Sequence, residues 1–177
     1  EEQETIIKNQ ELKLRNYNEI TEPKLIFGEK GNEYRPFYVP CCLTINSKGN
    51  IYVCGDNQIQ IFDSEGNFIS TFGSKGNENG QFEYPDAICI DKNDNIYVYD
   101  SRDQVQIFDS NGKFISKFES SHRFYNPVRM TINSKGNIIV SHRDQIATFD
   151  SKGKFISIFR SKGKENKELK YRIWNFY

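Results

Sequence analysis

The sequence predicts an all-β protein, a β-propeller of four-stranded blades, and three observations support this prediction. One pattern occurs three times, with the repeat prolines Pro40, Pro85 and Pro127 spaced 45 and 42 residues apart. Apolar and aromatic residues gather in short runs, several of which alternate with polar residues, as in 58–61. Each run ends at a turn rich in Gly, Asn and Asp. Such periods are typical of helical arrays or propeller blades, and the alternation favours strands.

Each repeat is expected to supply four strands, called a to d. Strand a follows the proline, strand b follows Gly-Asn or Asp-Asn, strand c ends in Phe-Asp, and strand d begins with Phe-Ile-Ser. A proline at the first position of a strand removes no ladder hydrogen bond. A twisted sheet with two apolar faces cannot stand alone, so the blades must pack face to face around an axis.

The second repeat carries a family resemblance. Residues 83–114 contain Pro-x-x-Ile-x-Ile-Asp, then Asn-Ile-Tyr-Val-x-Asp-Ser, Val-Gln-Ile-Phe-Asp and Gly-Lys-Phe. This order resembles the NHL repeat, and the resemblance extends over about 23–160. It implies a propeller, in that family typically six-bladed, that binds its ligands by one face. The chain departs from the family where Gln58, Gln104 and Gln145 replace an arginine that usually enters strand c.

One propeller domain is predicted, and its pieces follow from the repeat. They are a degenerate partial blade with strands b to d and a linker (1–37), three NHL-type blades (38–82, 83–124 and 125–168), and a strand a (169–177). Strand a could close a composite fourth blade with the N-terminal strands. It could equally start a further blade of a partial ring, such as a six-bladed one. Both alternatives stay open.

The charge is divided unevenly along the chain. Residues 1–112 hold 10 basic and 19 acidic residues, whereas residues 113–177 hold 14 and 5. This asymmetry predicts either a basic surface for a polyanion or two complementary edges that dock. The apolar runs are too short to span a bilayer, so no membrane partner is expected.

The cysteines and the first residue bear on the compartment. Cys41, Cys42, Cys54 and Cys89 lie on expected strands without the spacing of a metal site, and we interpret them as buried, reduced thiols. Reduced thiols favour a cytoplasmic location. The sequence begins with Glu1, so the N-terminus is expected to be incomplete.

Residues suited to catalysis are few. The two histidines lie in different loops, no repeated position is histidine, and no glycine-rich phosphate loop precedes a helix. The aspartates that end strand c, Asp63, Asp109 and Asp150, are explained by turn hydrogen bonds. We therefore predict a protein that is not an enzyme and has no cofactor or metal. A propeller-type lyase, which would place histidines of several blades at the axis, is a minor alternative.

The predicted function is a binding or scaffold module for a protein partner, including self-association. Candidate binding residues lie in the b–c loops and where strands a begin; they are Asp56, Asn57, Asp86, Arg102, Asp103, Arg129, His142 and Arg143. Single-stranded RNA is the alternative partner, bound through the basic third repeat and tail.

The predicted strand c of the second repeat gives a specific expectation about the core. Phe108 is expected to pack between blades. Gln106 is expected on the alternate side of the same strand, where it contributes far less to stability.

Overall fold

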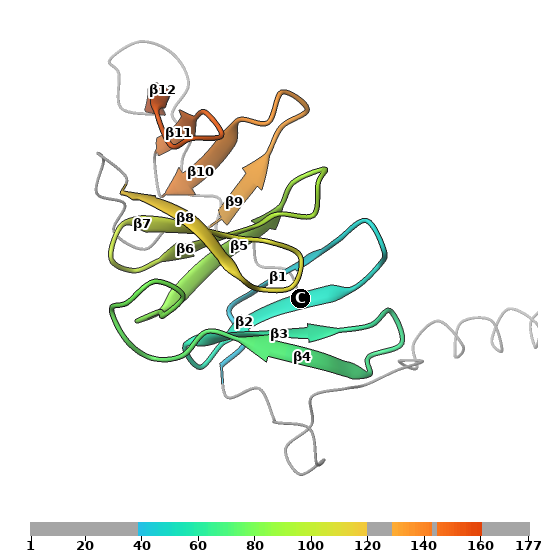
Figure 1. Ribbon diagram of the computed structural model, residues 1–177. Coiled ribbons are helices and arrows are strands. Elements are labelled where there is room, and N and C mark those ends of the chain that lie inside the picture. Colours follow the sequence, from blue (N-terminus) through green and yellow to red (C-terminus); the bar gives the residue numbers. More distant parts are fainter. Residues whose placement is uncertain (1–38, 120–128, 143–144, 161–177) are drawn as a thin grey trace, which may run out of the picture.

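The computed structural model describes residues 39–119, 129–142 and 145–160, which form three four-stranded antiparallel sheets (Figure 1). In chain order the strands are β1 (Cys42–Ile45), β2 (Ile51–Gly55), β3 (Gln58–Phe62), β4 (Phe68–Phe72), β5 (Pro85–Ile90), β6 (Ile96–Asp100), β7 (Gln104–Phe108), β8 (Phe114–Glu119), β9 (Arg129–Ile132), β10 (Ile138–His142), β11 (Gln145–Phe149) and β12 (Phe155–Arg160). No helix in these ranges is long and apolar enough to cross a membrane.

Each predicted repeat forms one sheet in which consecutive strands are neighbours. We call them blade 1 (β1–β4), blade 2 (β5–β8) and blade 3 (β9–β12). The first strands of the blades contact one another, β1 with β5 and β5 with β9, so each blade meets the next along its strand a. Figure 1 shows the three sheets stacked in chain order. The all-β prediction is thus confirmed for the described residues, whereas the expected partial blades at 1–37 and 169–177 lie outside them.

Six turns of one kind end strands a and c, and they explain the repeated aspartates. Asp63 Oδ1 accepts hydrogen bonds from the backbone N–H groups of Glu65 and Asn67, at 2.9 and 2.8 Å. Asp109 and Asp150 accept the same two bonds from the residues two and four positions further on. Asn46, Asp91 and Asn133 do so after strand a. The interpretation of the three strand-c aspartates as turn residues is confirmed.

The two apolar faces of blade 2 pack against different neighbours. Toward blade 1, a core forms around Phe108, with buried residues of both blades and of the linker between them. Toward blade 3, a second core includes Tyr99, Ile107 and Phe149. The alternation of side chains along a strand sends successive residues into the two cores. Blade 2 is therefore the central layer of the described structure.

The linker between blades 1 and 2, residues 73–84, contributes the side chain of Phe82 to the core. Phe82 is fully buried and its ring lies 5.7 Å from that of Phe108. Gly73 makes room for it, because a Cβ at this position would lie 2.5 Å from the Phe82 ring. The positive φ of Gly73, 88°, is also one that glycine adopts without strain.

The prediction that Gln106 and Phe108 lie on opposite sides of their strand is wrong. Residues two apart on a strand share a face, so Gln106 lies on the same side of β7 as Phe108, and it is fully buried. Its Oε1 accepts a hydrogen bond from the N–H of Gly80 at 2.8 Å, and its Nε2 donates to the carbonyl of Gln81 at 2.7 Å. These two bonds satisfy the amide and allow it to be buried.

Candidate functional site

One end of the blades gathers most of the predicted site residues, and we call it the loop face. It comprises residues 39–41, the b–c loops at 56–57 and 101–103, the linker 73–84, and the starts of β5 and β9. In an antiparallel sheet of four consecutive strands, strand a begins, strand d ends and the b–c loop turns at the same end of the blade. The a–b and c–d turns lie at the opposite end. The strand order therefore determines which loops meet here.

The b–c loop of blade 1 is a tight two-residue turn. Asp56 and Asn57 both have positive φ, 50° and 65°, as a type I′ hairpin requires. Asp56 is exposed, while the Asn57 side chain donates to the carbonyls of Phe82, at 3.4 Å, and Glu83. The turn thus holds the linker that leads into blade 2.

The b–c loop of blade 2 is one residue longer and carries an ion pair. Arg102 Nη2 lies 2.5 Å from Asp100 Oδ2, and the Asp100 side chain is fully buried. The Asp100 carboxylate also accepts the backbone N–H groups of Glu83 and Tyr84. Burial of the carboxylate is therefore accompanied by both charge pairing and hydrogen bonds.

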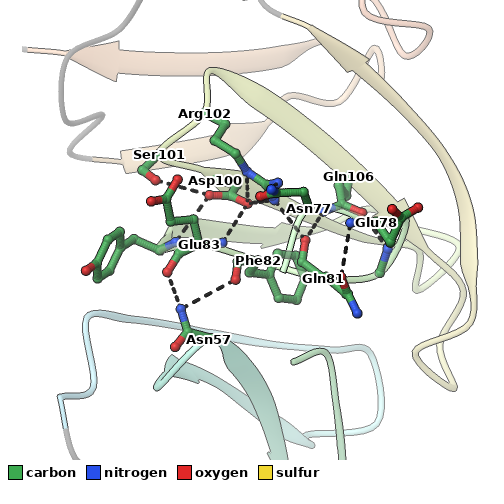
Figure 2. Close-up of polar contacts among 12 residues, drawn as sticks. Asn57, Asn77, Glu78, Gln81, Phe82, Glu83, Asp100, Ser101, Arg102 and Gln106 are labelled. Carbon is green, nitrogen blue, oxygen red and sulfur yellow. Dashed lines mark hydrogen bonds and ion pairs between the residues drawn. The ribbon is translucent and has the colours of Figure 1, made fainter. Parts of the chain in front are cut away.

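Arg102 connects this carboxylate to the linker, as Figure 2 shows. Its Nη1 donates to Asn77 Oδ1 at 2.8 Å, and its Nη2 donates to the carbonyl of Gln81 at 3.0 Å. The guanidinium therefore bridges the b–c loop and the linker 73–84. Its proposed contact with a ligand stays a prediction, and the structure gives it a positioning role.

Asp103 also has an internal partner. It adopts a positive φ of 61° at the end of the loop, and its Oδ1 accepts the hydroxyl of Tyr99 at 2.7 Å. Burial raises the pKa of Tyr99, and the hydrogen bond to Asp103 raises it further. Tyr99 therefore stays a protonated donor that fixes the orientation of Asp103.

The remaining predicted residues lie at blade 3. Arg129 is exposed at the start of β9, and its carbonyl accepts the Ser141 hydroxyl at 3.4 Å. His142 ends β10 and pairs with Gln145, but its side chain, like the whole of Arg143, lies outside the described residues. The structure thus brings Asn57 and Arg102 together around one linker, with Asp56 next to Asn57 in the same turn and Arg129 at the start of blade 3.

Three cysteines gather at the start of β1. Cys41 Sγ lies 3.8 Å from Cys42 Sγ, and Cys42 is the register partner of Cys54 on β2. The Cys41 thiol also donates to the carbonyl of Pro85 in blade 2, at 2.8 Å. The four cysteines are free thiols, and Cys54 and Cys89 are buried as predicted. Cys41 is exposed and Cys42 is only half-buried, contrary to the prediction, because Cys41 precedes β1 and Cys42 begins this edge strand of the sheet.

Asp86, the second residue of β5, lies near this group of thiols. Partial burial raises the pKa of Asp86 to about 6, and the charges of Cys41 and Asp100 add to the effect. A hydrogen bond from Cys42 lowers the pKa of the Cys41 thiol, with Cys54 adding to it. Sequence reasoning singled out Asp86 as a candidate binding residue but interpreted the cysteines only as buried thiols. Only the pairing of β1 with β2 brings Cys42 near Cys54. No group of three His, Cys, Asp or Glu side chains in the described ranges is arranged to hold a metal ion.

Replacing Asp86 with asparagine is expected to stabilise the protein at neutral pH. The folded pKa of about 6 exceeds the ordinary value of 3.8, so the folded state binds the proton more tightly and loses stability as pH rises between these values. Because Asp86 is only half-buried, water screens the cost, and we expect a gain of about 1 kcal/mol at pH 7.5. Urea unfolding of both proteins from pH 4 to pH 8 measures it. A gain that is the same at pH 4 contradicts this explanation.

Cys41 is expected to react first with an alkylating reagent. It is exposed and its thiol pKa is lowered, whereas burial raises the thiol pKa of Cys54 and Cys89. Iodoacetamide at pH 7 should therefore modify Cys41 at least tenfold faster than Cys89, as peptide mass spectrometry over time would show. This order would be refuted if Cys41 and Cys89 were modified at equal rates in the native protein, and if Cys89 reacted there as fast as it does in urea.

Comparison with known proteins supports the propeller fold. A family model described as a 6-bladed beta-propeller matches residues 43–130. A search of curated protein sequences finds no match. The described sheets and this match give the chain a β-propeller fold, as the sequence predicts. The matches do not single out the NHL repeat.

Several solved structures are similar in fold. A putative exported protein from Bacteroides fragilis has a TM-score of 0.62 at 15% identity, over 76% of this chain and 41% of that one. Virginiamycin B lyase from Staphylococcus aureus has a TM-score of 0.54 at 19% identity, over 73% and 44%. The WD40 repeats of RRP9 have a TM-score of 0.60 at 10% identity, over 71% and 40%. The chain thus spans less than half the length of these proteins, and identities this low show the fold alone.

Proposed function

We propose that this chain is a non-catalytic binding module that takes a protein segment with basic and apolar side chains on its loop face. The observation that carries the proposal is a pair of exposed apolar residues held among acidic ones. Val39 and Tyr84 are 66% and 63% exposed, and each directly precedes a repeat proline. The WD40 propellers among the similar structures make a protein-interaction scaffold compatible with the fold.

The charge of the loop face is complementary to a basic partner. Residues 39–41, 55–57, 73–86 and 100–103, together with Arg129 at the start of β9, contain six acidic and three basic residues. Glu83 is exposed beside Tyr84, and Asp86 follows two positions later. A cationic segment would be attracted to this face before any contact forms, and its apolar side chains could cover Tyr84.

The loop face is held in shape before a partner arrives. Arg102, Asp100 and Asn57 hold the backbone of residues 81–84 through the hydrogen bonds shown in Figure 2, and Arg102 also bonds the Asn77 side chain. A preorganised surface loses less conformational entropy when it binds. This rigidity favours binding of an extended segment over folding of the face around it.

A peptide array tests the proposal. The intact chain is applied to random peptides, and those selected should be enriched in Lys or Arg with an aromatic or aliphatic neighbour. Fluorescence anisotropy on the best peptide should then show at least tenfold weaker binding for Tyr84→Ala and for Glu83→Lys, as expected for a central contact and a reversed charge.

A matched charge reversal controls for net charge. Glu65 is exposed in the c–d turn of blade 1, at the opposite end of the blade. Glu65→Lys changes the net charge by the same amount as Glu83→Lys but should leave peptide binding within twofold. Equal losses in the two variants would mean non-specific attraction and would reject the loop face as the site.

RNA binding and self-association are the alternatives to peptide binding, and each has its own measurement. The described basic residues of blade 3 are split between the two ends: Arg129 and Arg160 lie where β9 begins and β12 ends, on the side of the loop face, whereas Lys135, Lys152 and Lys154 lie on the opposite turns. A groove of about 430 Å³ at that opposite end includes Lys92 and Lys135. Retardation of single-stranded RNA with a steep salt dependence, lost in Lys92→Glu and Lys135→Glu, would favour RNA over a peptide. Mass that grows with concentration in light scattering would favour self-association.

A further inference from the structure

A carboxylate joins blades 1 and 2 at the end opposite the loop face. Asp94, in the a–b turn of blade 2, accepts the backbone N–H of Ser47 in the a–b turn of blade 1 at 3.0 Å and the Ser47 hydroxyl at 2.7 Å. At the same end, the Tyr52 hydroxyl of blade 1 donates to the carbonyl of Ser110 in blade 2 at 3.4 Å. Two polar contacts thus close this end of the junction.

The next junction, between blades 2 and 3, has glycine in place of that carboxylate. Gly136 takes the position of Asp94 in the repeat, and Lys92 takes the position of Ser47. The φ of Gly136 is 80° and that of Asp94 is 61°, so both residues lie in the left-handed region. A Cβ at Gly136 would have no atom within 4 Å. The space that a side chain would enter from blade 3 is therefore open.

A groove of about 430 Å³ lies at this open junction. Its lining includes Ile90, Lys92 and Tyr97 of blade 2 and Ile132, Lys135 and Gly136 of blade 3. Sites for small molecules have volumes of about 300–1,000 Å³ and combine apolar walls with a few polar groups. The two isoleucines and the two exposed lysines supply both kinds of group here.

The lining also contains Asp91, whose carboxylate is bonded within its own turn. Its Oδ1 accepts the backbone N–H groups of Asn93 and Asn95, each at 2.9 Å. Its Oδ2 accepts the Asn95 side chain at 3.0 Å and the Tyr97 hydroxyl at 3.4 Å. Four donors share this negative charge, and the two lysines outnumber it, so the groove favours an anion.

We propose that this groove binds a small carboxylic acid, whose carboxylate takes the place that Asp94 fills between blades 1 and 2. The turns around Ser47 and Lys92 have the same internal hydrogen bonds, so the Lys92 N–H faces blade 3 as the Ser47 N–H faces blade 2. This N–H and the Lys92 ammonium bind the carboxylate, and Ile90 and Ile132 contact the apolar part of the acid. The inference goes beyond the proposed binding function and does not depend on it, because the groove and the loop face lie at opposite ends of the blades.

An NMR titration of the intact, ¹⁵N-labelled chain with hexanoate tests the site. The amide signals of Lys92 and Gly136 should shift and saturate. Hexanamide has the same apolar part without the charge and should bind roughly tenfold more weakly. Shifts that do not saturate would overturn the proposal. Inorganic phosphate that binds as tightly as hexanoate at equal ionic strength would do so too, because the groove would then attract anions of any kind.

Gly136→Asp places the missing carboxylate in the chain itself. Aspartate is among the residues that tolerate the left-handed region, as Asp94 shows, and its carboxylate should weaken hexanoate binding roughly tenfold by occupying the site. Gly49→Asp is the matched control, because Gly49 has the same position in blade 1 and a φ of 85°. It adds the same charge away from the groove and should leave binding within about twofold. Equal losses in both variants would overturn the proposal.

Variants of Lys92 test the proposed donor. Lys92→Ala should weaken hexanoate binding roughly tenfold, whereas Lys92→Arg keeps the charge and should retain most of it. Lys48→Ala removes an exposed lysine from the a–b turn of blade 1 and should change binding by less than about twofold. The urea midpoint should be the same in all three variants, which would show that the loss is local. Binding that is unaffected by Lys92→Ala would overturn the proposal.

Discussion

Phe108→Ala is expected to destabilise the protein by about 3–5 kcal/mol, as large-to-small changes in a packed core do. Phe108 is 1% exposed at the centre of the core between blades 1 and 2. Its ring contacts those of Phe72, Phe82 and Phe114, with centroids 4.9, 5.7 and 6.0 Å away. These rings come from blade 1, the linker and blade 2, so alanine would leave a cavity that no single element can fill.

Urea unfolding monitored by circular dichroism measures this loss, with Ile115→Ala as the control. Ile115 on β8 is largely exposed, so its truncation should change the free energy of unfolding by less than about 0.5 kcal/mol. If Phe108→Ala cost no more than Ile115→Ala, the packing of blade 2 against blade 1 through the Phe108 ring would be wrong.

Arg102→Ala is expected to cost about 3 kcal/mol, because it leaves the buried Asp100 carboxylate without its counter-charge. It also removes the bonds to Asn77 and Gln81, so the linker should loosen. Limited proteolysis should then cut within residues 77–84 in the variant before it cuts the wild-type protein. Urea unfolding gives the accompanying change in stability.

A second substitution distinguishes the lost charge pair from lost packing. Asp100→Asn added to Arg102→Ala removes the unpaired charge and keeps one oxygen, which can accept from the Tyr84 amide, while its NH2 group takes the place of the oxygen that accepts from the Glu83 amide. The double variant should therefore be more stable than Arg102→Ala alone. A double variant that is less stable still would show that the ion pair is not the main contribution of Arg102.

The fold was predictable because its signals are local and repeated. The proline before strand a, the Asx turns of Asp63 and Asp109, and the alternation in 58–61 each act within a few residues, and each recurs in register. The positive φ of Asp56 and Asn57 follows from the same local chemistry, since a two-residue hairpin requires it. Strand order and turn positions could therefore be inferred without any long-range contact.

The candidate site was predictable only in part. The non-repeating loop residues share one end of the blades because of the strand order, and Asp86 with its raised pKa is among them. No pattern in the residues indicated that the Arg102 guanidinium binds Asp100 and residues 25 and 21 positions earlier in the chain. The exposed pair Val39 and Tyr84 was not predictable either, because exposure depends on what packs nearby.

The sequence by itself determined the strands, the turns and the blade repeat of this protein, since hydrophobic alternation and turn chemistry act between near neighbours. Only the tertiary structure decided which polar residues are buried and which thiols are accessible. Gln106 is buried because the linker brings two backbone partners to it, and Cys41 is exposed because β1 begins one residue later. Both outcomes depend on groups that are distant in the chain or on where pairing starts, and neither leaves a pattern in the residues alone.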